Sequence, residues 1–442
     1  MSKLVVSDLH LSDGHPLHEN WGERQQRAWE RLLETAEREH PSAELIINGD
    51  CFDFLPTKPH GDDPDVTDSV TASAQMRHII AAHPDWFSAL RSFLRGTDHH
   101  VTFLIGNHDL ELAFAATRAL VRDAIGGPAG RVRFCLARAY RPMPDVEIEH
   151  GCQVDPWNRV PALWDAPKAL TTAGPDDLEL ADSGASGLER LDLPFGSRYY
   201  ARVLAPITER LPYFDAFVPA LPQVGVLALA CLYAPDLVVS GAAQARPLFD
   251  PAPAHTPATD DLARAAHLGP AHLFQAVLPE VATLRQQVWQ RTGAPVDTTH
   301  QQAAAAYAGA VMKALASDEL AALRAIFAAP RRSDASMPED DAIAAADMFG
   351  RSSALRIALC GHTHVEGLYQ LAGGAGTTTF VNEGTWFTRL ALPGPDDVNA
   401  PLAAWLRAPR EMPGPLRDAT AFTYALLCER PGGASSVELR EV

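Results

Sequence analysis

Five short segments of this chain carry side chains that commonly bind metal ions. They read Asp8-Leu9-His10, Gly49-Asp50, Gly106-Asn107-His108-Asp109, His150-Gly151 and Gly361-His362-Thr363-His364. Carboxylate, amide and imidazole groups in this mixture are the ligands expected for two adjacent divalent transition-metal ions. Two such ions roughly 3.5–4 Å apart can activate a water molecule and clamp a phosphoryl group during its displacement. The segments therefore predict a dinuclear metal centre suited to phosphoryl chemistry.

Each of these segments follows directly on an apolar run, at residues 3–7, 44–48, 101–105, 146–149 and 356–360. Apolar runs of this length, bounded by glycine and polar residues, are typical of buried strands. In open α/β sheets, ligand sites form outside the carboxyl ends of the strands. One such cluster alone would be weak evidence, but five clusters at five strand ends can converge on a single site.

The order D-x-H, G-D, G-N-H-D, H-G, G-H-x-H resembles that of the calcineurin-like metallophosphoesterases, and all five motifs are present between residues 8 and 364. The variant Gly49-Asp-Cys-Phe-Asp53, together with Asp8-Leu-His-Leu11, is most similar to the branch that includes UDP-2,3-diacylglucosamine hydrolase. That hydrolase has arginine at the position of His108, whereas His108 followed by Asp109 matches the general phosphoesterase pattern. The long middle of the chain has no clear counterpart in that branch.

The resemblance implies seven metal ligands: Asp8, His10 and His364 at a first ion, Asn107, His150 and His362 at a second, and Asp50 bridging both. A carboxylate suits the bridge because its two oxygens can bind separate cations. Four imidazoles favour manganese, iron or zinc over magnesium or calcium. We expect manganese first, with iron and zinc as alternatives.

The resemblance also implies catalytic roles for residues beside the ligands. His108 is expected to donate a proton to the leaving-group oxygen or to stabilise its charge, and Asp109 to orient His108. The nucleophile would be a metal-bound hydroxide, because water loses several pKa units on a dication. Asn107 and His108 are expected to contact the substrate as well.

Three further residues have competing interpretations. Asp53 is expected to support a ligand or to have only a structural role, and Asp155 either supports the site or forms a turn. Arg198 can reach a substrate phosphate, although most arginines in such a setting are solvated or structural.

Residues 1–155 alternate strand patterns with helix patterns at 21–39, 73–94 and 110–125, which predicts helices packed on a largely parallel sheet. Residues 156–350 break this rhythm. After a loop-like stretch at 164–193, alanine- and leucine-rich helix patterns follow at 272–292 and 301–328. Strand patterns return at 377–382, 420–428 and 436–440.

We therefore expect an α/β fold of the metallophosphoesterase type, with two sheets forming a sandwich flanked by helices. Residues 1–155 and 351–442 would form this core, and residues 156–350 a mostly helical cap that covers the metal site and selects the substrate.

Composition limits the class of substrate. The formal net charge of −18 disfavours binding of nucleic acid, because an acidic surface repels the phosphate backbone. A small phosphorylated substrate is compatible with this charge, since bound cations dominate the electric field at a metal site.

The six cysteines have no paired spacing and are expected to be small buried residues. The chain opens directly into a strand pattern with no signal-peptide pattern, so we expect a cytoplasmic protein.

Residues 216–235 contain no charged side chain. Three interpretations are open: a helix buried in the insertion, an apolar surface that faces a substrate or a membrane, or a membrane-spanning helix. Pro219, Pro222 and Pro235 interrupt the stretch, and the apolar part without a break is too short to span a bilayer. We favour the buried helix and keep peripheral membrane contact as the alternative.

The predicted reaction is metal-dependent hydrolysis of a phosphomonoester, phosphodiester or pyrophosphate bond in a small or lipid-linked substrate. A phosphoprotein phosphatase or a nuclease is the alternative among enzymes. A non-catalytic scaffold of the same fold would be expected to lack ligands or His108, and this chain retains all of them. The sequence leaves the oligomeric state open.

Overall fold

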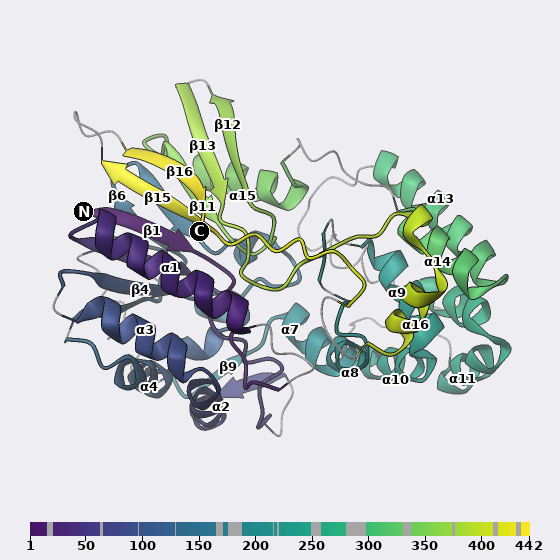
Figure 1. Ribbon diagram of the computed structural model, residues 1–442. Coiled ribbons are helices and arrows are strands. Elements are labelled where there is room, and N and C mark those ends of the chain that lie inside the picture. The colour runs from purple at the N-terminus through teal and green to yellow at the C-terminus, as the bar shows by residue number, and fades with distance from the viewer. Residues whose placement is uncertain are drawn as a thin grey trace. The chain divides into compact units, whose positions relative to one another are not determined.

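The computed structural model describes residues 1–15, 21–61, 65–95, 97–128, 130–164, 171–175, 188–214, 216–218, 221–248, 258–279, 298–329, 337–373, 376–409, 414–429 and 435–442 (Figure 1). Its contacts divide the chain into two compact units: Met1–Ser197, Met337–Phe387 and Ala421–Val442 form the first, and Arg198–Ser336 and Thr388–Thr420 the second.

These units differ from the expected core and cap at three segments. Residues 337–350 group with the first unit, where Met348 packs against Phe380. Residues 156–197 group with the first unit, where β9 (Arg190–Asp192) pairs with β3 (Val66–Asp68). Residues 388–420 group with the second unit, where β14 (Leu390–Ala391) pairs with β10 (Phe217–Val218). Contacts between distant parts of the chain are the physical reason, and they leave no local sign in the sequence.

Two mixed six-stranded sheets form the centre of the first unit. The first has the order β16 (Ser435–Glu441), β15 (Thr423–Glu429), β1 (Ser2–Val6), β2 (Ala43–Asn48), β4 (His100–Leu104) and β5 (Val132–Cys135). The second has the order β12 (Gly367–Gly373), β13 (Gly376–Asn382), β11 (Ile357–Cys360), β7 (Val146–Glu149), β6 (Ala139–Met143) and β8 (Thr172–Ala173). Strands β1, β2, β4 and β5 run parallel, as do β7, β11 and β13. Each sheet also contains antiparallel strands, such as β15 beside β1 and β12 beside β13.

Apolar residues cover both faces of the central strands, as expected for runs without polar alternation. In β1, Val5 belongs to a cluster that the two sheets share, with Ile148 of β7 and Leu359 of β11. Its neighbours Leu4 and Val6 belong instead to the cluster that the first sheet forms with its helices. Alternate residues of a strand point to opposite faces, so β1 contributes to two cores at once.

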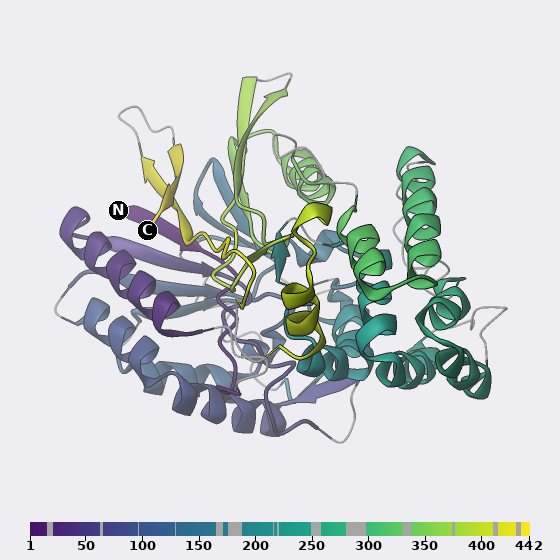
Figure 2. The ribbon, with the colours of Figure 1, turned by 45° about the vertical axis from the view of Figure 1, so that its right-hand side comes forward.

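Four helices belong to the cluster on the outer side of the first sheet: α1 (Glu23–Glu39), α2 (Ser69–Ala82), α3 (Pro84–Leu94) and α4 (Ala115–Ile125). Figures 1 and 2 show them beside this sheet from two directions. The outer face of the second sheet is covered by α15 (Glu339–Arg351), through Met348 against Phe380. The first unit is therefore an α/β structure in four layers, with helices outside and two sheets inside.

The expected single helix at 73–94 is two helices. Pro84 is the first residue of α3, and a proline inside a continuous helix would remove a hydrogen bond and clash with the preceding turn. The expected helix at 110–125 likewise begins with a separate 3-10 turn, Leu110–Ala113, before α4. The helix expected at 21–39 matches α1 apart from its first two residues.

The second unit is mostly helical in its described residues. Its main helices are α8 (Ala205–Arg210), α9 (Gln223–Tyr233), α10 (Pro235–Ala245), α11 (Thr259–Leu268), residues 270–279, α13 (Thr298–Leu315), α14 (Glu319–Phe327) and α16 (Ala400–Arg407). The helix pattern expected at 301–328 is divided between α13 and α14, because the Asp318 side chain caps α14 by accepting from the Ala321 amide. The part of the 272–292 pattern beyond residue 279 lies outside the described residues.

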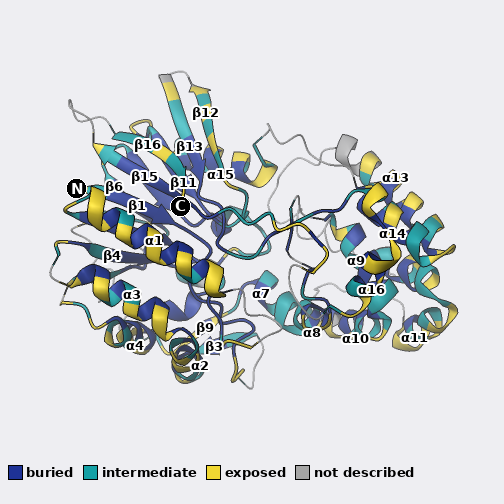
Figure 3. Cartoon of the chain, viewed as in Figure 1, coloured by how far each residue is buried: buried dark blue, intermediate teal, exposed yellow. Residues whose placement is uncertain are grey.

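The uncharged stretch forms β10 and α9, and α9 is partly buried within the second unit (Figure 3). Ala228, Leu229, Ala230 and Cys231 are all buried, whereas Leu227 is half-buried. In the described part of the chain, no helix is long and apolar enough to cross a membrane.

Candidate metal centre

The predicted metal motifs follow β1, β2, β4, β7 and β11, and their side chains meet. Three groups have ligand atoms within 4.8 Å of one another: Asp8 with His10 and His364, His10 with Asp50 and His108, and Asp50 with His150 and His362. The remaining predicted ligand, Asn107, places Oδ1 3.3 Å from Nε2 of His150. The structure thus brings together all seven side chains that the sequence singled out as ligands, and His108 with them.

The first group has the spacing of ligands around one ion. Oδ1 of Asp8 lies 2.9 Å from Nε2 of His364 and 3.7 Å from Nε2 of His10, and the two imidazole nitrogens are 3.2 Å apart. Atoms bound at about 2.1 Å to one ion lie about 3.0–3.4 Å apart at octahedral or tetrahedral angles. The distance between the two imidazole nitrogens falls in this range, and the two distances to Asp8 lie just below and just above it. Oδ1 of Asp8 is buried and has no hydrogen-bond partner among the described residues. A divalent cation would satisfy it.

The second group has similar spacing. Nε2 of His150 lies 3.2 Å from Oδ2 of Asp50 and 3.3 Å from Oδ1 of Asn107. The other ring nitrogen of His150, Nδ1, is 2.9 Å from the Asn48 carbonyl oxygen. A carbonyl can only accept, so the neutral imidazole carries its proton on Nδ1 and offers the lone pair of Nε2 to an ion. Asp50 is shared by two of the three groups, which is the arrangement a bridging ligand requires.

Unusual backbone conformations mark this centre. Among the described residues, φ is positive at five residues other than glycine, with values from 49° to 68°: Asp8, His10, Asp50, His362 and His364. All five are predicted ligands. Residues other than glycine rarely adopt this left-handed conformation, and such strain is concentrated at functional sites. Backbone hydrogen bonds hold two of these turns, from the Trp386 amide to the Asp8 carbonyl and from the His10 amide to the Asp50 carbonyl.

Two motif glycines are required by close packing at the centre. A Cβ atom on Gly361 would overlap Oγ of Ser7 and Oδ2 of Asp8. A Cβ atom on Gly106 would overlap Oδ1 of Asp50. The glycines of the G-N-H-D and G-H-x-H motifs therefore let the ligand-bearing turns approach the carboxylates.

The carboxylate that contacts His108 is not the one predicted. Nδ1 of His108 lies 2.9 Å from Oδ1 of Asp53. Both oxygens of Asp109 instead accept backbone hydrogen bonds, from the amide of Gly106 at 2.7 Å and from that of Cys51 at 2.8 Å. The predicted role of Asp109 in orienting His108 therefore stays a prediction, and the carboxylate contact that the structure shows for this imidazole is the one with Asp53. Asp109 fixes two motif loops, and Asp53 holds the imidazole.

Buried opposite charges set the titration of the centre. Burial lowers the pKa of His150, but the Asp50 carboxylate outweighs it and raises that pKa to about 10. Burial likewise lowers the pKa of His108, while Asp53 and Asp50 raise it to a value above the ordinary one. Burial and the neighbouring Asp50 charge raise the pKa of Asp109 to about 7. Carboxylates and imidazoles thus compensate one another's charge at this centre.

The structure also places residues whose roles the sequence left open. Asp155 follows the short helix η2 (Cys152–Val154), and its Oδ2 lies 3.0 Å from Nε2 of His362. Arg198 lies in α7 (Phe195–Tyr199) and groups with the second unit, so its contact with a substrate stays a prediction.

One neighbour of the centre was missed from the sequence. The half-buried Phe387 ring lies 5.9 Å from the ring of His10 and 6.2 Å from that of His364, measured between centroids. Phe387 comes directly after the segment Asn382-Glu-Gly-Thr-Trp386, and none of the five sequence motifs includes it.

The cysteines next to the motifs are not ligands of these groups. All six cysteines are free thiols, and Cys51, Cys152 and Cys360 are buried. Burial raises the pKa of each of these three thiols well above its ordinary value. They act as small apolar residues behind the motif loops.

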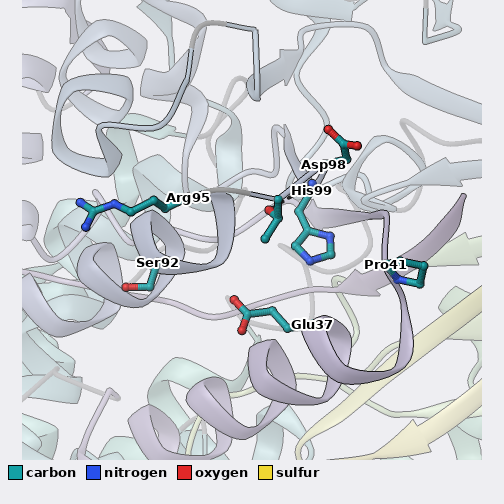
Figure 4. A pocket seen from close by; sticks show the side chains of 7 residues that line it. Glu37, Pro41, Ser92, Arg95, Asp98 and His99 are labelled. Carbon is teal, nitrogen blue, oxygen red and sulfur yellow. Dashed lines mark hydrogen bonds between the residues drawn. The ribbon is translucent and has the colours of Figure 1, made fainter.

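A separate pocket lies elsewhere in the first unit (Figure 4). Its volume is about 540 Å³, and its lining includes Glu37, Arg95, Asp98 and His99. His99 precedes the first residue of β4, so the pocket lies at the amino ends of the strands, opposite the edge that carries the motifs. It is no part of the metal centre.

Comparison with models of known protein families found no match to this chain. Comparison with curated proteins found no match either. The interpretation of the site therefore rests on its own geometry and chemistry.

Proposed function

We propose that this protein is a dinuclear metal-dependent phosphoesterase with the two-sheet fold of the calcineurin-like metallophosphoesterases. The observation that carries the proposal is the convergence of three groups of histidine and carboxylate ligands that share Asp50 and His10. The spacing of their atoms fits two divalent ions, with manganese as our first choice and iron or zinc as alternatives. When bound, such a pair supplies an activated water and stabilises the charge of a phosphoryl group.

The chain's own residues would supply positioning and proton transfer. His108 lies beside the ligands, its ring centroid 4.8 Å from that of His10, and it is held through Nδ1 by Asp53. Nε2 of His108 is then the atom that donates a proton to the leaving-group oxygen. Asn107 would hold an ion through Oδ1 while adding no negative charge, which favours an anionic substrate.

The substrate we propose is a small or lipid-linked phosphate compound. The net charge of −18 weighs against a nuclease, and a phosphoprotein phosphatase is the alternative that the same chemistry allows. We assign substrate selection to the helical second unit, with Arg198 as a candidate phosphate contact. Because four consecutive residues of α9 are buried, we favour a structural role over membrane contact for this helix.

A substrate screen tests this proposal. The purified protein, loaded with Mn²⁺, is assayed against phosphomonoesters, phosphodiesters, pyrophosphates, nucleotide sugars, phospholipids, phosphopeptides and single-stranded DNA. We expect turnover of at least one class of small phosphate compound that depends on Mn²⁺. Asp50→Ala should abolish this turnover and lower the content of bound ions, because it removes the ligand shared by both groups.

Asp98→Ala is the matched control, because this aspartate lines the remote pocket. It should keep both turnover and bound ions. Full turnover with two bound ions in Asp50→Ala would exclude the dinuclear assignment, and cleavage of DNA or phosphopeptides alone would exclude the proposed substrate class.

A further inference from the structure

The ring nitrogens of the histidines at the centre are not all oriented alike. In two of them, Nδ1 faces an acceptor of the surrounding protein. Nδ1 of His108 lies 2.9 Å from Oδ1 of Asp53, and Nδ1 of His150 lies 2.9 Å from the carbonyl oxygen of Asn48. In His10, Nδ1 is the nitrogen nearer to Asp53, at 3.5 Å from Oδ2. His362 is reversed, because its Nε2 lies 3.0 Å from Oδ2 of Asp155.

We propose that Asp155 is a positioning residue that fixes the tautomer of His362, so that this histidine offers Nδ1 to the metal centre. The inference deepens the proposed function, since it concerns the same centre. A neutral imidazole has one N–H and one lone pair. Because a carboxylate accepts but does not donate, Asp155 selects the tautomer with the proton on Nε2. The lone pair then lies on Nδ1, the nitrogen left for the group formed with Asp50 and His150.

The orientation of Asp155 is itself fixed. Its Oδ1 accepts from the Trp157 amide at 2.8 Å, and its Oδ2 accepts from Nδ2 of Asn158 at 2.6 Å. Both oxygens therefore already act as acceptors, which is the behaviour of a carboxylate. The turn and the histidine contact therefore use the same carboxylate.

The local fold explains why Asp155 can reach His362. The chain leaves β7 at His150, turns at Gly151, where φ is 113°, and forms one turn of 3-10 helix before Asp155. One strand end thus supplies a predicted ligand, His150, and the acceptor for a second ligand that comes from β11. On its other side, the His362 loop is held by Thr363, whose hydroxyl donates to Asp341.

Asp155→Asn is the decisive variant, because it reverses the hydrogen-bond polarity at constant shape. The Trp157 amide can only donate, so the amide oxygen of the new side chain must stay against it. The amide nitrogen then faces His362 and Asn158. The amide of Asn158 must rotate to present its oxygen, because its Nδ2 donates to this position in the parent protein. The new amide nitrogen donates to Nε2 of His362, which moves the proton of the imidazole to Nδ1 and removes the lone pair there.

Two measurements detect the change, one of the tautomer of His362 and one of the affinity for Mn²⁺. The first is nitrogen NMR of the imidazole rings in the ion-free protein, in which the signals of His362 are identified by their loss in His362→Gln. We expect the Nε2–H tautomer of His362 in the parent protein and the Nδ1–H tautomer in Asp155→Asn. Titration with Mn²⁺ should show one ion bound about 10–100-fold more weakly, the usual effect of losing such a partner, and the other ion unchanged.

Two control variants separate positioning from a turn role. Asn158→Ala removes a hydrogen bond of the same turn and should keep the tautomer and both affinities. Asp155→Glu keeps an acceptor and should retain the Nε2–H tautomer. An unchanged tautomer with unchanged Mn²⁺ affinities in Asp155→Asn would overturn the proposal, as would an Nδ1–H tautomer of His362 in the parent protein.

The NMR measurement needs no metal, so the two proposals can fail separately. A tautomer switch in a protein that binds no Mn²⁺ would support the positioning role of Asp155 and overturn the proposed metal-dependent function.

Discussion

Asp53 lies between two histidines of the candidate centre, with Oδ1 2.9 Å from Nδ1 of His108 and Oδ2 3.5 Å from Nδ1 of His10. One carboxylate therefore orients both the proposed proton donor and a predicted ligand of the first ion. Its backbone is anchored as well, because the Asp53 amide donates to the Leu11 carbonyl at 2.7 Å. If the proposed function holds, proton transfer and metal binding are linked through this residue.

We expect Asp53→Asn to lower kcat by about 10–100-fold, the usual cost of removing such a supporting carboxylate. Mn²⁺ affinity should fall less than kcat, because the closer contact is with His108 and the longer one with His10. Steady-state kinetics and metal analysis of the same preparation measure both effects. An unchanged kcat with weakened metal binding would assign Asp53 to the ligand alone.

For His108→Ala we expect kcat to fall by about 10²–10⁴-fold, the usual range for a lost general acid, with bound metal near the parent content. The loss should be smaller for nitrophenyl esters, because their leaving groups need no proton. Comparing alkyl and nitrophenyl phosphates tests this. An equal loss for both would point to a role of His108 in ground-state binding instead.

Gly361→Ala should disrupt the metal centre without any change of charge. The added Cβ would overlap Oγ of Ser7 and Oδ2 of Asp8, so the His362 loop must move away from Asp8. We expect strongly reduced Mn²⁺ binding in a titration.

Gly350→Ala, in helix α15 of the same unit, is the control, since its Cβ would meet no atom within 4 Å. It should keep metal binding and raise stability by about 0.5–1 kcal/mol through helix propensity. Normal Mn²⁺ affinity in Gly361→Ala would contradict the close approach of the two motifs.

Glu44 predicts a pH dependence of stability that is independent of the metal centre. Its carboxylate is buried in β2, where it accepts from Nζ of Lys3 at 2.5 Å, the hydroxyl of Thr102 at 2.6 Å and that of Tyr140 at 2.9 Å. Burial raises the pKa of Glu44, but these partners lower it below its ordinary value of 4.5. A depressed pKa stabilises the fold above pH 4.5, and this contribution is lost as the pH falls from there through the folded-state pKa.

Glu44→Gln should therefore lower the free energy of unfolding by about 3 kcal/mol at pH 7, because it leaves Lys3 without its buried partner. The difference from the parent protein should shrink below about pH 4.5 as Glu44 becomes protonated. Denaturant unfolding of the chelator-treated proteins at several pH values measures it. A difference that does not change with pH would contradict the depressed pKa.

The uncharged helix α9 gives a matched pair of variants. Leu229 is fully buried and Leu227 is half-buried, so Leu229→Asn should lower the free energy of unfolding by about 2–5 kcal/mol and Leu227→Asn by much less. Activity should follow stability in both. If Leu227→Asn instead weakened binding of a lipid-linked substrate while hydrolysis of nitrophenyl phosphate persisted, the helix would have an apolar recognition surface.

The strands and the side chains that follow them could be predicted because both leave local signals. Apolar runs at 3–7 and 44–48 correspond to β1 and β2, and the polar residues at the end of each run, Asp8 and Asp50, reach the centre. Parallel strands bring such ends to one edge of a sheet whatever their distance in the sequence. The convergence of these residues could therefore be predicted without knowing any individual side-chain contact.

The finer contacts could not be predicted, because they depend on side-chain direction within tight turns. Asp53 and Asp109 are both acidic residues close to a ligand, and only the coordinates show that Asp53 meets His108. The reversal of His362 relative to His150 could not be predicted either. A histidine in a sequence does not reveal which of its two ring nitrogens faces the centre. The assignment of residues 388–420 to the second unit depends on the pairing of β14 with β10.

The order of the ligands along the chain has a consequence for biosynthesis. Each of the two predicted ion positions draws ligands from the beginning of the chain and from the loop after β11, since His362 and His364 complete the groups begun by Asp50 and Asp8. Strand β1 pairs with β15, at residues 423–429, so its edge stays open until these residues have been made. A growing polypeptide thus has neither predicted ion position complete before His362 and His364 have been made, and the proposed function implies that metal loading follows their synthesis.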